Sequence, residues 1–207
     1  MTNIDNNKLN IELSLTKRKL IESFKAMYTG ELFPENIFYI GIFQKALANI
    51  QGFLDLIEKK NYLMASALIR IHLDSLLTIF AINKHGTNLT NHLRGKDGRL
   101  ENYKPRISYS NLAEDFDKEY NTEWCLSVFK NCSSFVHTSS KYFSSTIVNY
   151  ENGIFTNRIC FNGDVELDEK QISELLLAII EISNYLIIYF DSYSDSKSSF
   201  VKNFTNS

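Results

Sequence analysis

Apolar residues recur every three or four positions along most of the chain, which is the spacing of one buried face of an α-helix. This pattern predicts helices over residues 9–28, 35–59, 62–83 and 169–191, with helical patterning also from Asn111 and again from Thr122 to about Tyr142. A break is expected near Asn121, between the stretches that start at Asn111 and Thr122. The predicted fold class is therefore mostly α, a helical bundle of about five helices.

The helix predicted over residues 62–83 is apolar nearly all round, which is typical of a central, buried helix. Arg70 and Asp74 are polar exceptions that lie one turn apart within an apolar stripe of this helix. Because an unpaired charge in a core is costly, each of these side chains needs a partner. We therefore expect either a structural ion pair between Arg70 and Asp74 or a polar pocket at the bundle centre that both side chains reach.

The segment before the last predicted helix has a different pattern. Residues 144–162 alternate apolar and polar positions around Asn152 and Gly153, a pair that is favoured in type I′ turns. This alternation predicts a small β-hairpin. Residues 84–108 combine glycines, Pro105 and many charges with little apolar periodicity, and they predict a surface loop.

Length and composition favour a single helical domain over residues 1–207. A hydrophobic content of 44% is ordinary for a globular chain of 207 residues. The small number of turn-forming residues, 8 Gly and 2 Pro, favours long helices over a β-sandwich or barrel. Residues 1–8 and 192–207 are polar, and we expect both ends to be flexible.

Charge and cysteine content limit the partners and the compartment. The formal net charge of −2 gives no global positive field, so any contact with RNA is expected to be local. Cys125, Cys132 and Cys160 are an odd number without zinc-site spacing, which indicates reduced thiols and a cytoplasmic protein. Polar residues interrupt the most apolar stretch, 175–190, so no membrane segment is expected.

The helix predicted over residues 122–142 carries a polar stripe that includes Ser127, Lys130, Ser134 and His137. At 1.5 Å per residue, Lys130 and His137 lie about 10 Å apart on one face. Histidine can accept a proton from a ribose 2′-hydroxyl near neutral pH, and a fixed cation can offset charge that develops on the phosphate. The stripe therefore supports metal-free RNA cleavage. A surface or hydrogen-bonded structural histidine is the alternative interpretation.

The run from Lys130 to His137, Lys-Asn-Cys-Ser-Ser-Phe-Val-His, resembles the signature of the HEPN superfamily. That signature is an Arg, often followed by a polar residue, and then a His on a late helix of an all-α bundle. Asn131 and His137 match the signature, whereas Lys130 stands in place of its Arg. The wider chain resembles a bacterial group with HEPN-like helices, whose central helix carries an Arg and an acidic residue one turn apart, here Arg70 and Asp74.

The resemblance covers about residues 60–145 and implies a helical bundle that is frequently a homodimer, with the motif helices facing each other across the interface. It also implies one of two activities. Many HEPN proteins are metal-independent ribonucleases of toxin or phage-defence systems, while others are non-catalytic binding modules. Lysine lacks the planar fork that arginine offers a phosphate, so Lys130 is not an equivalent substitute for the motif Arg. Arg70 is the candidate for the missing guanidinium.

Two functional hypotheses follow. In the first, the chain is an endoribonuclease whose candidate residues are His137 as general base or acid, Lys130 and Arg70 as phosphate stabilisers, and Asn131, Ser134 and Asp74 in support. In the second, the chain is a non-catalytic interaction module with a buried network of Arg70, Asp74 and His137. Its dimer face then binds another protein, for example one encoded in the same operon.

No metal or cofactor is predicted. The four histidines show no metal-ligand spacing with each other or with the cysteines; they are His72, His85, His92 and His137. The pair Gly95-Lys96 lacks the upstream glycine of a phosphate-binding loop and does not follow a strand.

Overall fold

The computed structural model describes residues 5–28, 34–85, 108–136, 147–151, 154–157 and 167–205. Within them the elements are α1 (Asn6–Tyr28), α2 (Pro34–Glu58), α3 (Tyr62–His85), α5 (Tyr109–Tyr120), α6 (Trp124–Val136), β1 (Ile147–Glu151), β2 (Ile154–Asn157) and α8 (Glu169–Thr205). The predicted helical bundle is therefore confirmed. Of the predicted surface loop, residues 86–107 lie outside the described part of the chain, as do the turn residues Asn152 and Gly153.

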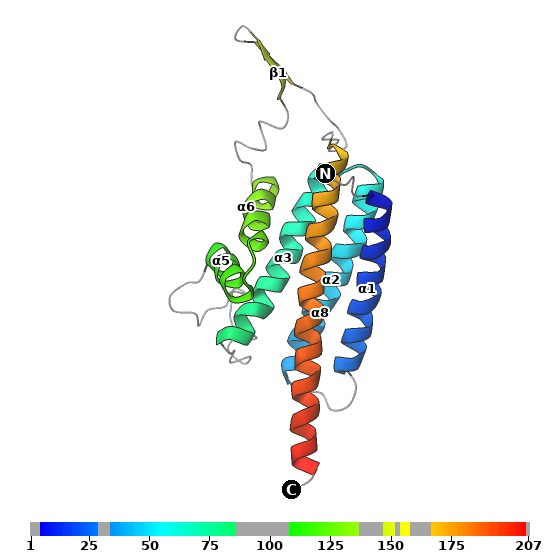
Figure 1. Cartoon of the computed structure of the whole chain (residues 1–207), viewed down its shortest axis with the longest axis vertical. Coiled ribbons are helices and arrows are strands. Elements are labelled where there is room, and N and C mark those ends of the chain that lie inside the picture. Colours follow the sequence, from blue (N-terminus) through cyan, green and yellow to red (C-terminus); the bar gives the residue numbers. More distant parts are fainter. Residues whose placement is uncertain are drawn as a thin grey trace.

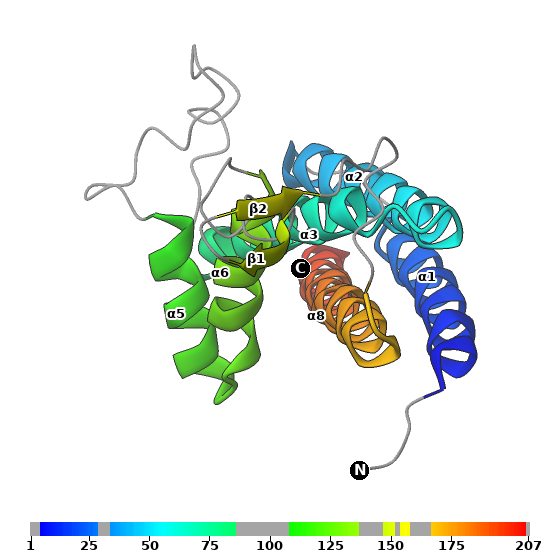
Figure 2. The same cartoon turned by 90° about the horizontal axis from the view of Figure 1, so that it is seen from above.

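Helix α3 is the centre of the bundle. It packs against α2 and α8 on one side and against the shorter helices α5 and α6 on the other, while α1 packs mainly on α8 (Figures 1 and 2). Leu73, Leu76 and Leu77 of α3 are wholly buried, as the all-round apolar pattern of this helix predicts. Residues of α5, α6 and α8 therefore lie close together along α3.

The predicted break near Asn121 is confirmed, and a carboxylate holds it. Asn121 has a left-handed backbone, with φ 52°, and its N–H donates to the carbonyl of Asp117. The Asp117 side chain accepts hydrogen bonds from the Thr122 hydroxyl at 2.6 Å and from the backbone N–H groups of Cys125 at 3.0 Å and Leu126 at 2.9 Å. Asp117 therefore ends α5 and satisfies the first free N–H groups of α6.

The predicted end of the last helix near Asp191 is wrong, because α8 continues to its C-terminal bound of Thr205. Two side chains beyond Asp191 hold this extension on the bundle. The Tyr193 ring stacks on Tyr39 of α2, with centroids 4.1 Å apart. Lys197 is only 8% exposed, and its amine donates to the carbonyl of Met27 at 3.1 Å, in the last turn of α1.

The strands β1 and β2 pair antiparallel, with Glu151 opposite Ile154 and Tyr150 opposite Phe155. The register is irregular between Ile147 and Asn149. In Figure 1 β1 lies beyond the end of α6, away from the four long helices. The residues that form the candidate sites below lie on α3, α5, α6 and α8.

Two helices are long and apolar enough to cross a membrane by length and composition alone, over Tyr62–Lys84 of α3 and Glu169–Ser198 of α8. In this structure both segments pack in the bundle, where 61% of the α3 window and 44% of the α8 window is buried. The central helix of a water-exposed bundle has the same length and composition, so these segments alone are weak evidence for a membrane location.

Candidate functional site

The first candidate site surrounds Arg70, where α3, α5 and α6 meet. The guanidinium of Arg70 forms an ion pair with Asp74, one turn along α3, as one of the two expectations from sequence states. Its Nε donates to the Ser133 hydroxyl of α6 at 2.9 Å. The guanidinium carbon lies 4.0 Å from the centre of the Phe129 ring and 5.8 Å from that of Tyr109. Arg70 thus joins three helices through one charged group.

Hydrogen bonds around this cluster fix its orientation. The Ser133 hydroxyl donates to the carbonyl of Phe129 at 2.6 Å, which leaves its oxygen free to accept from Arg70. On the α5 side, Thr78 and Tyr109 share a hydrogen bond of 3.0 Å between their hydroxyl oxygens. The Arg70 side chain is 11% exposed, and burial lowers the pKa of its guanidinium. A nearly buried, multiply bonded guanidinium is typical of a structural group.

The other residues predicted from sequence do not join this cluster within the described part of the chain. Lys130 is exposed on α6, in contrast to Phe129 and Ser133, which face Arg70. Asn131 is also exposed and lines the groove described next. Ser134 belongs to α6, but its side chain is outside the described residues, as is all of His137.

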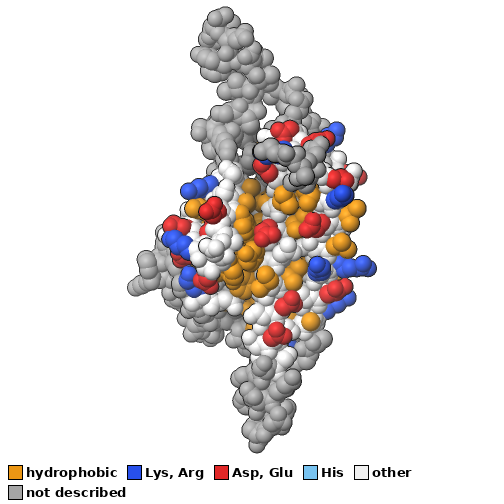
Figure 3. Space-filling model, in the orientation of Figure 1, with side chains coloured by type: hydrophobic (Ala, Val, Ile, Leu, Met, Phe, Trp, Pro, Cys, Tyr) orange, Lys and Arg blue, Asp and Glu red, His pale blue; other side chains and the backbone are white. Residues whose placement is uncertain are grey.

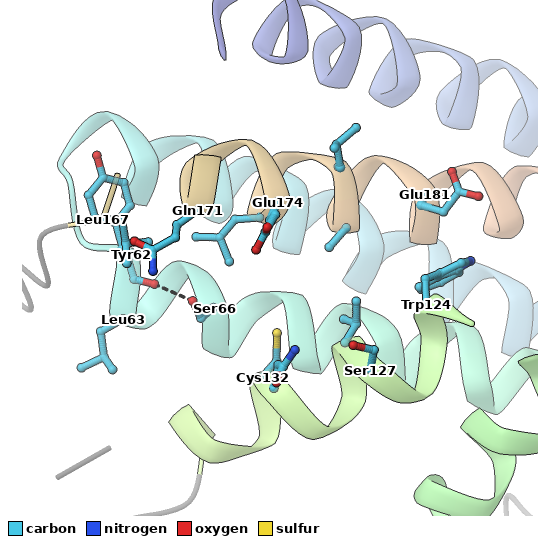
Figure 4. A pocket seen from close by; sticks show the side chains of 15 residues that line it. Tyr62, Leu63, Ser66, Trp124, Ser127, Cys132, Leu167, Gln171, Glu174 and Glu181 are labelled. Carbon is cyan, nitrogen blue, oxygen red and sulfur yellow. Dashed lines mark hydrogen bonds between the residues drawn. The ribbon is translucent and has the colours of Figure 1, made fainter. Parts of the chain in front are cut away.

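The second candidate site is a groove between α6 and α8, with the first turns of α3 as its floor (Figures 3 and 4). Its volume is about 660 Å³. It is lined by Tyr62, Leu63, Ser66, Trp124, Ser127, Val128, Asn131, Cys132, Leu167, Gln171, Glu174, Leu175, Leu177, Ala178 and Glu181. Figure 3 shows a strip of hydrophobic side chains exposed along this groove. The groove was not predicted from the sequence, because its apolar residues have the same spacing as core residues.

One end of the groove is aromatic and acidic. Trp124 stands at the start of α6, and Glu181 of α8 lies at the same end of the groove (Figure 4). The Trp124 ring packs against the rings of Phe116 and Tyr185, at centroid distances of 5.8 and 5.9 Å. Burial raises the pKa of the Tyr185 hydroxyl, and the nearby Glu181 carboxylate raises it further. The described lining residues include two carboxylates and no Lys, Arg or His.

His72 is wholly buried in the core between α3 and α8. Its Nε2 lies 3.0 Å from the Ser183 hydroxyl oxygen, and that hydroxyl donates its own proton to the carbonyl of Ile179 at 2.7 Å. Nε2 must therefore carry the ring proton and donate to Ser183. Nδ1 has no hydrogen-bond partner within the described structure. Burial, with a smaller contribution from Lys45, lowers the pKa of His72 to about 3.

Neither a metal-binding cluster among the described residues nor a similar known protein points to a function. The described residues contain no group of three or more His, Cys, Asp or Glu side chains that could hold a metal ion. No family model matches the chain, and neither a curated protein nor a solved structure shows significant similarity to it.

Proposed function

We propose that this chain is a HEPN-like, non-catalytic interaction module. The proposal keeps the predicted architecture of a helical bundle with a small β-hairpin before the last helix. The observation that supports it best is the state of Arg70. The guanidinium that was the candidate for phosphate binding is bonded to Asp74 and Ser133, stacks over Phe129 and is 11% exposed. A group engaged in this way holds helices together instead of meeting a substrate.

Exposed apolar side chains support a role in binding. On α1, Ile11 and Leu15 are 62% and 51% exposed, and on the adjacent helix α8 Ile188 is 52% exposed. Large apolar side chains that face water on neighbouring helices are typical of interaction surfaces. We propose that these two helices form a homodimer face or bind a partner protein. If the face forms a homodimer, replacing both Leu15 and Ile188 with Glu should lower the mass measured by light scattering to that of one chain, with the helical circular dichroism unchanged.

A metal-independent endoribonuclease of a toxin or phage-defence system is the second candidate function. One observation favours it: Lys130 is exposed on α6, where its amine can reach a phosphate. On this hypothesis His137 follows on the same predicted stripe and acts as general base or acid. Arg70 then serves only to position α6 against α3.

One pair of measurements separates the two functions. Purified protein is incubated with RNA in the presence of a chelator, and the unfolding free energy is measured by urea titration for wild type, Arg70→Ala and Lys130→Ala. The interaction module predicts no cleavage. It also predicts a loss of about 2–3 kcal/mol for Arg70→Ala, which leaves Asp74 without its partner. Lys130→Ala is the exposed control and should change stability by less than about 0.5 kcal/mol.

The outcome that would overturn the proposal is equally definite. If the wild type cuts RNA in chelator, and His137→Ala abolishes cutting while its melting temperature stays within a few degrees of wild type, the chain is a ribonuclease. A small effect of Arg70→Ala on stability would also contradict a structural role for the cluster.

A further inference from the structure

The groove between α6 and α8 has the size and lining of a small-molecule site. Its volume of about 660 Å³ lies within the roughly 300–1,000 Å³ that is typical of ligand pockets. Half-buried aliphatic side chains form its walls, among them Leu63 of α3, Val128 of α6 and Leu175 of α8. Apolar surface that stays in contact with water is a source of binding free energy for an apolar ligand.

The charged side chains that line the groove determine which ligand charge it favours. Glu174 and Glu181 lie two turns apart on α8, and both line the groove. Glu174 is 3.7 Å from Lys170, so its charge is partly balanced by an exposed partner. Glu181 forms no ion pair within the described part of the chain, and no described lining residue is basic. The groove therefore favours a cation over an anion.

The aromatic end provides a place for the cation. The face of an indole attracts ammonium groups, and Trp combined with a carboxylate is a typical environment for such groups. Trp124 is held in place by Phe116 and Tyr185, so its ring needs little reorganisation when a ligand binds. In Figure 4 Trp124 and Glu181 lie at the same end of the groove, and Leu63 lies toward the other.

We propose that this groove binds an apolar ammonium compound. The cationic head lies between Trp124 and Glu181, and the hydrocarbon body extends over Val128 and Leu175 toward Leu63. This inference goes beyond the interaction role of α1 and α8, and it stands or falls independently of whether Arg70 is structural. Neither function proposed above requires a small ligand.

The only tryptophan of the chain is Trp124, so its fluorescence reports directly on the proposed site. The full-length protein is titrated with octyltrimethylammonium, and in parallel with octyl sulfate and octyl glucoside, all below their micelle concentrations. The expected result is a saturable change in emission, with affinity for the cation at least tenfold higher than for either matched compound. Equal affinity for all three compounds, or no saturable change, would overturn the proposal.

Variants locate the site. Glu181→Gln is expected to weaken binding of octyltrimethylammonium by about tenfold, which corresponds to about 1.4 kcal/mol. Glu12→Gln, on the exposed side of α1, is the matched control and should leave the affinity unchanged. Ser127 is exposed and lines the groove, so Ser127→Lys adds a positive charge without disturbing the core and should abolish binding of the cation. If either groove variant binds the cation like the wild type, the assignment is wrong.

A protein occupant gives a different result. If the groove instead receives a helix from a second copy, diluting the protein without ligand will shift the Trp124 emission at the concentration where light scattering shows dissociation. That outcome would refute the small-molecule assignment. A stable emission spectrum across the dilution series, together with saturable binding of the cation, supports it.

Discussion

Replacing His72 with Gln tests how strongly the core opposes a buried charge. His72 is 0% exposed, and burial lowers its pKa to about 3, against about 6.5 for an accessible histidine. Above pH 6.5 the imidazole is neutral in both the folded and the unfolded chain, so His72 contributes no pH dependence to stability there. Between pH 6.5 and 3 only the unfolded chain binds the proton. The free energy of unfolding therefore falls as the pH falls through this window, and no further below pH 3.

The magnitude follows from the two pKa values. Each pH unit within the window is worth about 1.4 kcal/mol, so lowering the pH from 7.5 to 5.0 should cost the wild type about 2 kcal/mol through His72 alone. Gln carries an amide N–H that can still donate to Ser183, and it does not titrate. The His72→Gln variant should thus lose about 2 kcal/mol less than the wild type over the same pH change.

The assay is urea unfolding followed by far-ultraviolet circular dichroism at pH 7.5 and pH 5.0 for both proteins. Other titrating groups affect both proteins alike, so the quantity of interest is the difference between their two pH dependences. If wild type and His72→Gln lose the same stability between pH 7.5 and 5.0, His72 is either accessible to protons or charged in the folded chain. Either finding would refute the buried, neutral imidazole.

Three further predictions concern the break between α5 and α6 and the two glycines of α2. Asp117→Asn keeps the size of the side chain but loses the charge and one acceptor oxygen. It should lower the unfolding free energy measured by urea titration by about 1 kcal/mol. An unchanged unfolding free energy would mean that the three hydrogen bonds accepted by this side chain contribute nothing to stability. Gly41→Ala places a methyl group where, apart from the neighbouring residues and the backbone of its own helix, no atom lies within 4 Å. It should raise the unfolding free energy by about 0.5–1 kcal/mol and the melting temperature with it. Gly52→Ala has the same helix propensity gain but brings its methyl group to 3.1 Å from Leu68, so it should be less stabilising than Gly41→Ala, and equal gains would contradict the tight contact.

The features that could be predicted from sequence are those with a local cause. The helical spacing of apolar residues is a property of each segment, so the bundle and its central helix α3 followed from it. The break at Asn121 was also local, because asparagine tolerates the left-handed backbone that ends a helix. The position of the C-terminal end of α8 has no such local cause. The residues after Asp191 are polar and rich in serine, and contacts of Tyr193 and Lys197 with α2 and α1 hold the start of this extension on the bundle.

In the Arg70 site, too, the features with a local cause could be predicted and those that depend on distant residues could not. That Arg70 and Asp74 would meet was predictable, because residues four apart on a helix are neighbours. Whether the pair would face a substrate or a packed interface depended on Ser133, which is 63 residues away in the sequence. Since the spacing of Arg70 and Asp74 is the same in both cases, no pattern within α3 distinguishes a phosphate-binding arginine from a structural one. The partner helix makes that distinction: Phe129 covers the guanidinium, and Ser133 accepts its Nε–H.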